Sequence, residues 1–141
     1  MLKYGTAIIS NPTMREFWRK DLLDMKRNGI NIVKMLLVWE DVEPERGVYN
    51  YDAMKQLLNI CEEIEMNVLL EIRDKNRGFP RWFVKSYPDT MPVTADGTPR
   101  LNGSCYNNPV YQEAISHFIE KTINELKTYR CIKYWDIWNE A

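Results

Sequence analysis

The chain has 141 residues, 45% of them hydrophobic, and a formal net charge of −1. This length and composition predict a folded globular domain and exclude an intrinsically disordered chain. The near-balanced charge gives no electrostatic basis for binding nucleic acid or an anionic membrane surface.

Membrane insertion and secretion are not expected from the sequence. No apolar run approaches the roughly 20 residues of a membrane-spanning helix. Residues 1–5 lack the hydrophobic region of a signal peptide. A cytoplasmic location is therefore expected.

The cysteines and the single histidine limit the kinds of site that this chain can build. Cys61, Cys105 and Cys131 are odd in number and far apart, so we expect reduced thiols rather than a disulfide framework or a closed zinc site. His117 alone excludes a His-rich metal site, and its place within a helical stretch predicts a helix-surface or partly packed residue. No cofactor and no metal are expected.

Hydrophobic periodicity divides the chain into alternating strands and helices. Strands are expected at residues 4–9, 32–38, 68–72 and 132–141, and long helices at about 14–28, 52–65 and 110–128. Trp18, Leu22 and Met25 form one face of the first helix, and Gly29 supplies its stop. Met54, Leu57, Leu58, Cys61 and Ile64 form the buried stripe of the second.

Long loops follow the strands, whereas short loops precede them. Residues 39–49 are expected to form a polar loop, and residues 73–111 a long irregular segment with a short helix at 80–86. A structureless loop of that length is uncommon in a compact domain unless it is functional. The asymmetry predicts a parallel sheet whose working edge is at the carboxyl ends of the strands.

Two α/β architectures can hold four such strands: a doubly wound sheet and one half of an eight-stranded barrel. The first strand-to-helix turn lacks Gly-x-Gly-x-x-Gly, and no phosphate-binding Gly-Lys-Ser/Thr loop occurs. We therefore predict the first half of a (β/α)8 barrel.

The last expected strand carries the leading candidate for chemistry. Side chains alternate along a strand, so Tyr134, Asp136, Trp138 and Glu140 share one face, which predicts a polar interior. Glu140 is a candidate proton donor at the strand's carboxyl end, and Asn139 is a hydrogen-bonding group beside it. The alternative is an ordinary solvated glutamate.

Other strand ends add candidate substrate-binding residues. Trp39 and Glu40 follow the second strand, and Arg73 and Asp74 follow the third. Aromatic side chains in or near the long loops could stack on sugar rings or could pack the loops. These aromatic residues are Trp39, Phe79, Trp82, Tyr106 and Trp138.

Five motifs in chain order resemble those of a known family. They are the helix and turn from Trp18 to Asn31, the loop Trp39-x-x-x-Glu43-Pro44-Glu45-x-Gly47-x-Tyr49, the segment Pro80-x-Trp82-Phe83, the segment Cys105-x-Asn107-x-Pro109-x-Tyr111, and the pair Asn139-Glu140. Together they resemble glycoside hydrolase family 42, the β-galactosidases of clan A, over most of the chain.

The resemblance implies a (β/α)8 barrel and a retaining mechanism on β-glycosides. It implies that Glu140 is the general acid/base and that Asn139 bonds the 2-hydroxyl of the sugar. The nucleophile of that family follows the seventh strand, so it is expected outside this chain. Trp39, Arg73 and Trp138 are the expected substrate-binding residues, and the substrate is a carbohydrate.

We therefore expect residues 1–141 to be the N-terminal half of a glycosidase barrel, truncated and inactive alone. The alternative is a non-catalytic sugar-binding or scaffold half barrel. Such a half barrel has unpaired sheet edges, so a homo-oligomer, in the simplest case a homodimer, is possible.

Overall fold

The computed structural model describes residues 4–9, 12–74, 79–98 and 104–137. The chain forms two compact units. Unit 1 consists of Met1–Leu37, Tyr51–Ile72 and Glu125–Ala141, and unit 2 of Val38–Asn50 and Arg73–Asn124.

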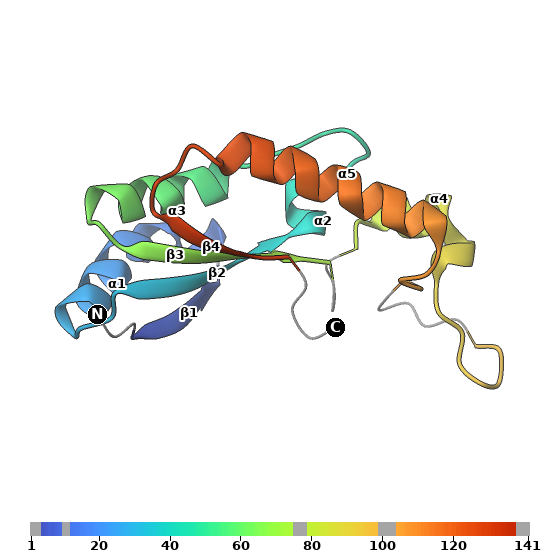
Figure 1. Ribbon diagram of the computed structural model, residues 1–141, viewed down its shortest axis with the longest axis horizontal. Coiled ribbons are helices and arrows are strands. Elements are labelled where there is room, and N and C mark those ends of the chain that lie inside the picture. Colours follow the sequence, from blue (N-terminus) through green and yellow to red (C-terminus); the bar gives the residue numbers. More distant parts are fainter. Residues whose placement is uncertain (1–3, 10–11, 75–78, 99–103, 138–141) are drawn as a thin grey trace. The chain divides into compact units, whose positions relative to one another are not determined.

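A four-stranded sheet organises unit 1 (Figure 1). Its strands are β1 (Gly5–Ile9), β2 (Ile32–Val38), β3 (Asn67–Arg73) and β4 (Ile132–Asp136), in the spatial order β1-β2-β3-β4. The pairs β1–β2 and β3–β4 are parallel. A sheet whose spatial order follows the chain order agrees with the predicted half barrel.

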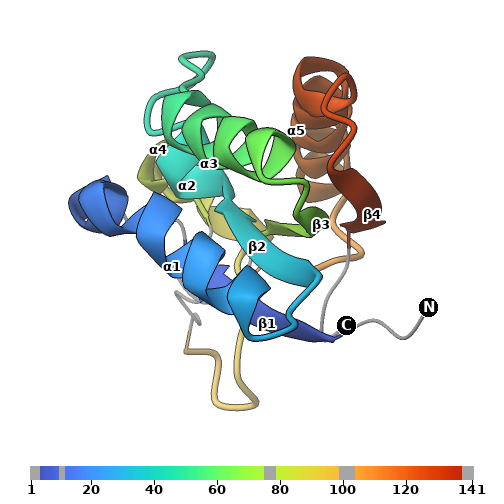
Figure 2. The same cartoon turned by 90° about the vertical axis from the view of Figure 1, so that its left-hand side faces the viewer.

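Helices α1 (Arg15–Arg27) and α3 (Asp52–Glu63) lie against the same face of this sheet (Figures 1 and 2). Trp18 and Leu22 are the buried residues of α1, and Gly29 follows that helix at φ +85°, where glycine is favoured. The predicted stripe of α3 is confirmed, because all five of its residues are buried: Met54, Leu57, Leu58, Cys61 and Ile64.

The two faces of the sheet differ in burial. On β2 the alternate residues Val33, Met35 and Leu37 are fully buried, as expected for side chains beneath the helices. Lys34 and Leu36 lie on the opposite face and are half-buried. That second face would become the inside of a closed barrel, since barrel helices lie outside the strands.

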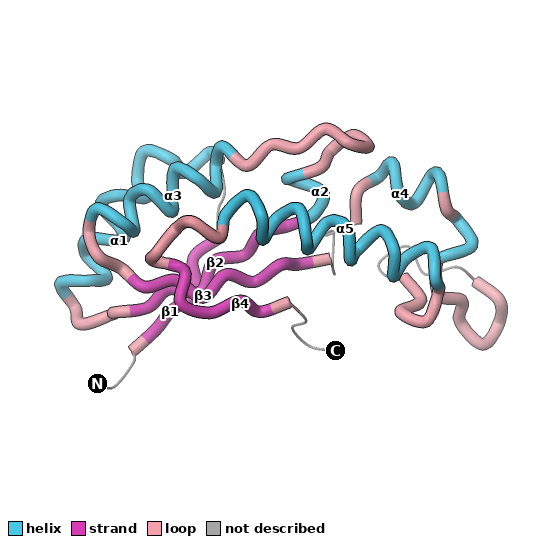
Figure 3. The backbone as a smooth tube through the Cα atoms, turned by 45° about the horizontal axis from the view of Figure 1, so that its top comes forward, coloured by secondary structure: helices cyan, strands magenta, loops and turns pink. Residues whose placement is uncertain are grey.

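Unit 2 is built from one long helix, short helices and loops, shown by secondary structure in Figure 3. It holds α2 (Trp39–Val42), α4 (Arg81–Ser86), the 3-10 turn η2 (Pro88–Thr90) and α5 (Pro109–Leu126) up to Asn124. The short helix predicted at 80–86 is confirmed. The loop predicted at 39–49 instead begins with the helical turn α2, which is too short to show a periodic pattern.

Aromatic side chains form the core of unit 2. Trp39 lies at the centre, with its ring centroid 5.2 Å from that of Phe118 and 5.4 Å from that of Phe83. Phe79 and Trp82 each lie 6.2 Å from Trp39. No helix within the described ranges is long and apolar enough to cross a membrane.

Candidate active site

The open face of the unit 1 sheet carries three charged side chains on neighbouring strands. Glu71 of β3 pairs directly with Asp136 of β4. The Nζ atom of Lys34, on β2, lies 2.8 Å from Glu71 Oε2 and 3.0 Å from Asp136 Oδ2. The polar interior predicted from Asp136 is therefore present, with Lys34 bridging two carboxylates.

Electrostatics explains why Lys34, Glu71 and Asp136 form an ion triad. Two carboxylates directly opposite each other on adjacent strands repel, and the Glu71 side chain is only 2% exposed. Lys34 offsets that repulsion. Its hydrogen bond to Glu71 raises the pKa of Lys34 above the ordinary value, although partial burial acts in the opposite direction.

Sequence reasoning missed Lys34 and Glu71. The available signal was a charged residue within each of two strands that are otherwise almost entirely apolar. Burying an unpaired charge costs a large desolvation free energy, so a charged residue in such a strand indicates a partner on a neighbouring strand.

The residues predicted at the end of the last strand are Trp138, Asn139 and Glu140, and they lie outside the described residues. β4 ends at Asp136, four positions before Glu140. The structure therefore describes the strand that leads to this pair but not the pair itself.

The exit of β3 carries two further predicted residues. Arg73 is the last residue of the strand and is half-buried. Asp74 follows it and accepts a hydrogen bond from the hydroxyl of Tyr111, a buried residue of α5. Burial, and then the bond to Asp74, raises the pKa of the Tyr111 phenol, so this hydroxyl stays a donor.

Trp39 has a packing role within unit 2. Its side chain is 1% exposed, and its indole Nε1 donates to Glu43 Oε2 at 2.7 Å. Contact between this ring and a substrate stays a prediction. Glu40, beside it, pairs with Arg81, whose Nε lies 3.2 Å from Glu40 Oε1.

Glu43 organises the loop that follows β2. Glu43 is 4% exposed, and its carboxylate accepts hydrogen bonds from Trp39 Nε1 and, at 2.8 Å, from the backbone N–H of Gly47. Gly47 adopts φ +79°, which favours glycine. The backbone carbonyl of Glu43 accepts from Trp82 Nε1 at 3.0 Å. The sequence motif Trp39-x-x-x-Glu43-Pro44-Glu45-x-Gly47 is thus a folding unit.

His117 is exposed on α5, as predicted. Across the described residues, no group of three or more His, Cys, Asp or Glu side chains could hold a metal ion.

Comparison with known proteins places this fold. The family model for glycoside hydrolase family 42, described as β-galactosidase, matches residues 10–141. The chain belongs to glycoside hydrolase family 42. Its four-stranded sheet with alternating helices is therefore the first half of the (β/α)8 barrel predicted from the sequence.

Individual relatives agree with this assignment. The chain is 27% identical over 142 residues to the β-galactosidase bgaB of Geobacillus kaustophilus, covering 97% of this chain and 21% of that protein. It is 28% identical over 141 residues to the β-galactosidase BgaH of Haloferax lucentense, covering 96% and 21%.

A solved structure shows the same arrangement. The cold-adapted β-galactosidase of Rahnella sp. R3 superposes with a TM-score of 0.85 at 27% identity, covering 99% of this chain and 21% of that one. The chain thus spans about a fifth of the length of the proteins that it matches.

Proposed function

We propose that this chain is the first half of the catalytic barrel of a retaining, β-galactosidase-like glycosidase that hydrolyses β-glycosides. The observation that carries the proposal is the family match, which extends through Asn139 and Glu140. β4 supports it, because this strand runs toward that pair and already presents Asp136 on the polar face.

In the first step, the protonated carboxyl of Glu140 gives its proton to the glycosidic oxygen while a second carboxylate attacks the anomeric carbon. The bond to the leaving alcohol breaks, and a glycosyl-enzyme ester forms. In the second step, the Glu140 carboxylate takes a proton from water, which attacks the same carbon and releases the sugar. The second carboxylate belongs to the other half of the barrel.

Asn139 supports the same steps without transferring a proton. Its amide would form a hydrogen bond with the 2-hydroxyl of the sugar, a contact that strengthens in the transition state. Trp39, Arg73 and Trp138 are the further residues proposed to bind substrate.

The test uses the protein expressed from the complete reading frame that encodes this chain. An aryl β-galactoside is the substrate, and Glu140→Ala is the variant. We expect turnover to fall by about two to four orders of magnitude, which is the usual contribution of a general acid/base. Added azide should restore release of the aryl group, because azide attacks the glycosyl-enzyme without needing a base.

Glu45→Ala, an exposed glutamate in the loop after β2, is the matched control and should keep its turnover. Retained activity in Glu140→Ala, or a loss that azide does not rescue, would reject the assigned role. The 141-residue chain by itself should show no enzymatic turnover, because we propose that the second carboxylate follows a later strand of the barrel. Turnover by this chain that disappears in Glu140→Gln would overturn that expectation.

A further inference from the structure

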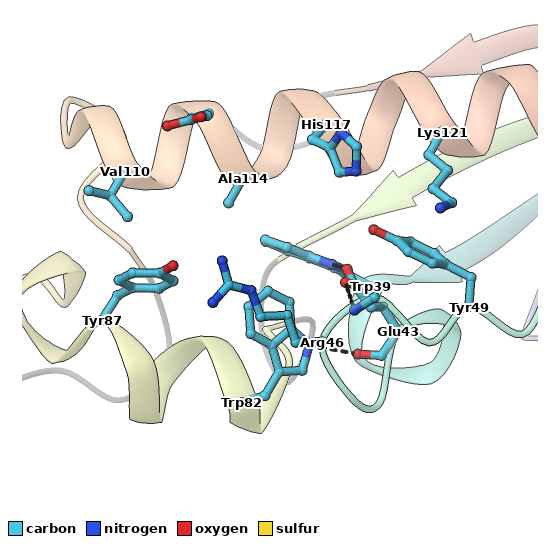
Figure 4. Close-up of a pocket in the computed structure, with 12 residues that line it drawn as sticks. Trp39, Glu43, Arg46, Tyr49, Trp82, Tyr87, Val110, Ala114, His117 and Lys121 are labelled. Carbon is cyan, nitrogen blue, oxygen red and sulfur yellow. Dashed lines mark hydrogen bonds between the residues drawn. The ribbon is translucent and has the colours of Figure 1, made fainter.

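Unit 2 contains a groove, lined in part by Trp39, that has no role in the steps proposed for Glu140 and Asn139. The cavity has a volume of about 500 Å³, within the range of small-ligand sites. One wall is the face of α5 that carries Val110, Ala114, His117 and Lys121 (Figure 4). The other wall comes from the loop after β2 and from the α4 region, and it includes Arg46, Tyr49, Trp82 and Tyr87.

Two cations in the groove rest on aromatic rings. The guanidinium carbon of Arg46 lies 5.9 Å from the ring centroids of both Trp82 and Tyr87. The Nζ atom of Lys121 lies 4.1 Å from the ring centroid of Tyr49. Within the part of the chain that the structure describes, neither cation pairs with a carboxylate.

The stacked guanidinium retains its recognition chemistry. An aromatic ring attracts the positive charge but does not use up the five N–H donors of a guanidinium, so these donors stay available to a ligand. That planar fork matches the two oxygens of a carboxylate. Arg46 therefore offers a prepositioned carboxylate receptor, and Lys121 offers a second cation in the same groove.

The acidic residues of the groove do not cancel this preference. Both carboxylate oxygens of Glu43 are already engaged, by Trp39 Nε1 and the N–H of Gly47. Positions 110, 114, 117 and 121 form one stripe of α5, and Glu113 lies at the edge of that stripe by helix geometry. The centre of the stripe is His117, which can donate or accept a hydrogen bond.

We propose that this groove binds a saccharide that carries a carboxylate, such as a hexuronic acid, with Arg46 and Lys121 holding the carboxylate. A neutral sugar would leave the charges of Arg46 and Lys121 without a counter-charge, so a carboxylate is favoured. The carboxylate preference rests on the groove alone, whereas the choice of a saccharide rests on the proposed glycosidase function.

The single histidine makes the test direct. The 141-residue chain contains one histidine, so labelling histidine with ¹³C gives one imidazole signal, which arises inside the groove. Titration with D-galacturonate at constant pH should shift this signal to saturation. Arg46→Gln should weaken binding at least about tenfold, since it removes the bidentate charge-assisted contact. Lys121→Gln should weaken it less, and Arg46→Lys should give an intermediate loss because the charge remains without the fork.

Lys85→Gln is the matched control. This substitution removes one positive charge, as Lys121→Gln does, but Lys85 is an exposed residue of α4 that does not line the groove. The variants concern exposed side chains, and circular dichroism checks their folding. Added salt should weaken binding in the parent chain. No saturable shift, or equal binding by Arg46→Gln, would overturn the site.

Two further ligands separate the parts of the proposal. Galactose bound as tightly as galacturonate would overturn the role of the carboxylate. Inorganic phosphate or acetate bound as tightly as galacturonate would contradict the proposal that the ligand is a saccharide. Because a free monosaccharide has no glycosidic bond to cleave, the signal of His117 reports groove binding independently of the Glu140 assay. Failure of one proposal is therefore distinguishable from failure of the other.

Discussion

The two units of this chain are stabilised in different ways. Unit 1 buries aliphatic side chains from alternate positions of its strands against the stripes of α1 and α3. Its charged groups are paired across three strands through Lys34. Unit 2 contains the long helix α5 but no β-sheet strand pairing of its own among the described residues. It buries a cluster of aromatic rings around Trp39, together with the hydrogen-bonded carboxylate of Glu43.

This difference shows how half of a barrel can combine a regular scaffold with irregular loops. Aliphatic burial tolerates changes of shape at similar volume, so a regular sheet can be kept with many sequences. A cluster of rings held by specific hydrogen bonds tolerates fewer changes. Substitutions in unit 2 should therefore have more localised and more residue-specific effects than those in unit 1.

The largest expected effect tests whether the units unfold separately. Trp39→Ala removes the central ring of unit 2 and should cost about 3–5 kcal/mol of stability there. Trp18→Ala, at a buried tryptophan of α1, is the matched change in unit 1. Hydrogen exchange should show lost protection mainly at residues 38–50 and 73–124 for the first variant, and in α1 and its neighbours for the second. Equal loss in both units for both variants would mean that they form one cooperative block.

A smaller effect is expected at the ion triad. Lys34→Met leaves Glu71 and Asp136 facing each other without a cation and should destabilise the chain by about 2 kcal/mol, below the cost of breaking a fully buried pair because Lys34 and Asp136 are partly exposed. Urea unfolding monitored by circular dichroism measures this. Lys133→Met, at an exposed lysine of β4, should change stability by less than about 0.5 kcal/mol. Equal effects of the two substitutions would mean that the triad does not stabilise unit 1.

The next smaller effect is expected at the buried carboxylate of Glu43, in the loop after β2. Glu43→Gln keeps the shape of the side chain but replaces one acceptor with an N–H₂ group that faces a donor, so a loss of about 1–2 kcal/mol is expected. Tryptophan fluorescence during urea unfolding should report it, because Trp39 donates to Glu43. Glu45→Gln changes an exposed neighbour and should be nearly neutral. If Glu45→Gln lowers the stability as much, the hydrogen bonds of Glu43 with Trp39 and Gly47 do not stabilise unit 2.

The smallest effect near neutral pH concerns two thiols of unit 1. Burial raises the pKa of Cys61 and of Cys131 from 9.0 to about 12. Because the pKa is higher in the folded chain, each thiol loses its proton at a lower pH in the unfolded chain. The contribution of these thiols to the free energy of unfolding is therefore fully present well below pH 9 and is lost as the pH rises from about 9 to about 12. Up to pH 9 the loss should stay below about 1 kcal/mol.

Thermal unfolding at increasing pH measures this dependence. Cys105→Ser removes an exposed thiol and should leave the pH profile unchanged. In the folded chain a thiol reagent should modify Cys105 first, since Cys61 and Cys131 are buried. A stability that stays constant from pH 9 to 11, or fast labelling of all three cysteines, would contradict the burial of these thiols in solution.

The elements of unit 1 were predictable because each leaves a periodic pattern. The stripe from Met54 to Ile64 repeats with helical spacing, and the nearly continuous apolar run of β2 predicts a strand covered on both faces. In the structure one face of β2 is buried and the other is half-buried. The four-residue helix α2 was not predicted, since one turn cannot display a period. Its position is stabilised by the bond from Trp39 to Glu43, which depends on the following loop.

The ion triad shows where sequence reasoning stops. Asp136 was expected on a polar face, but its partners depend on strand register. A register irregularity between Val68 and Leu69 is what brings Glu71 opposite Asp136. A shift of one residue would turn Glu71 to the other face, so no pattern within a single strand identifies this contact. The cation stacks of the groove likewise join residues from three separate segments.

By itself, the sequence determined the order of strands and helices, the half-barrel fold and the family, because burial periodicity and local motifs are properties of contiguous residues. Only the tertiary structure decided that Lys34 bridges Glu71 and Asp136, that Trp39 is a core residue of unit 2, and that Arg46 lies over Trp82 and Tyr87. These contacts join residues distant in the chain, and their energies depend on register and packing that no local pattern records.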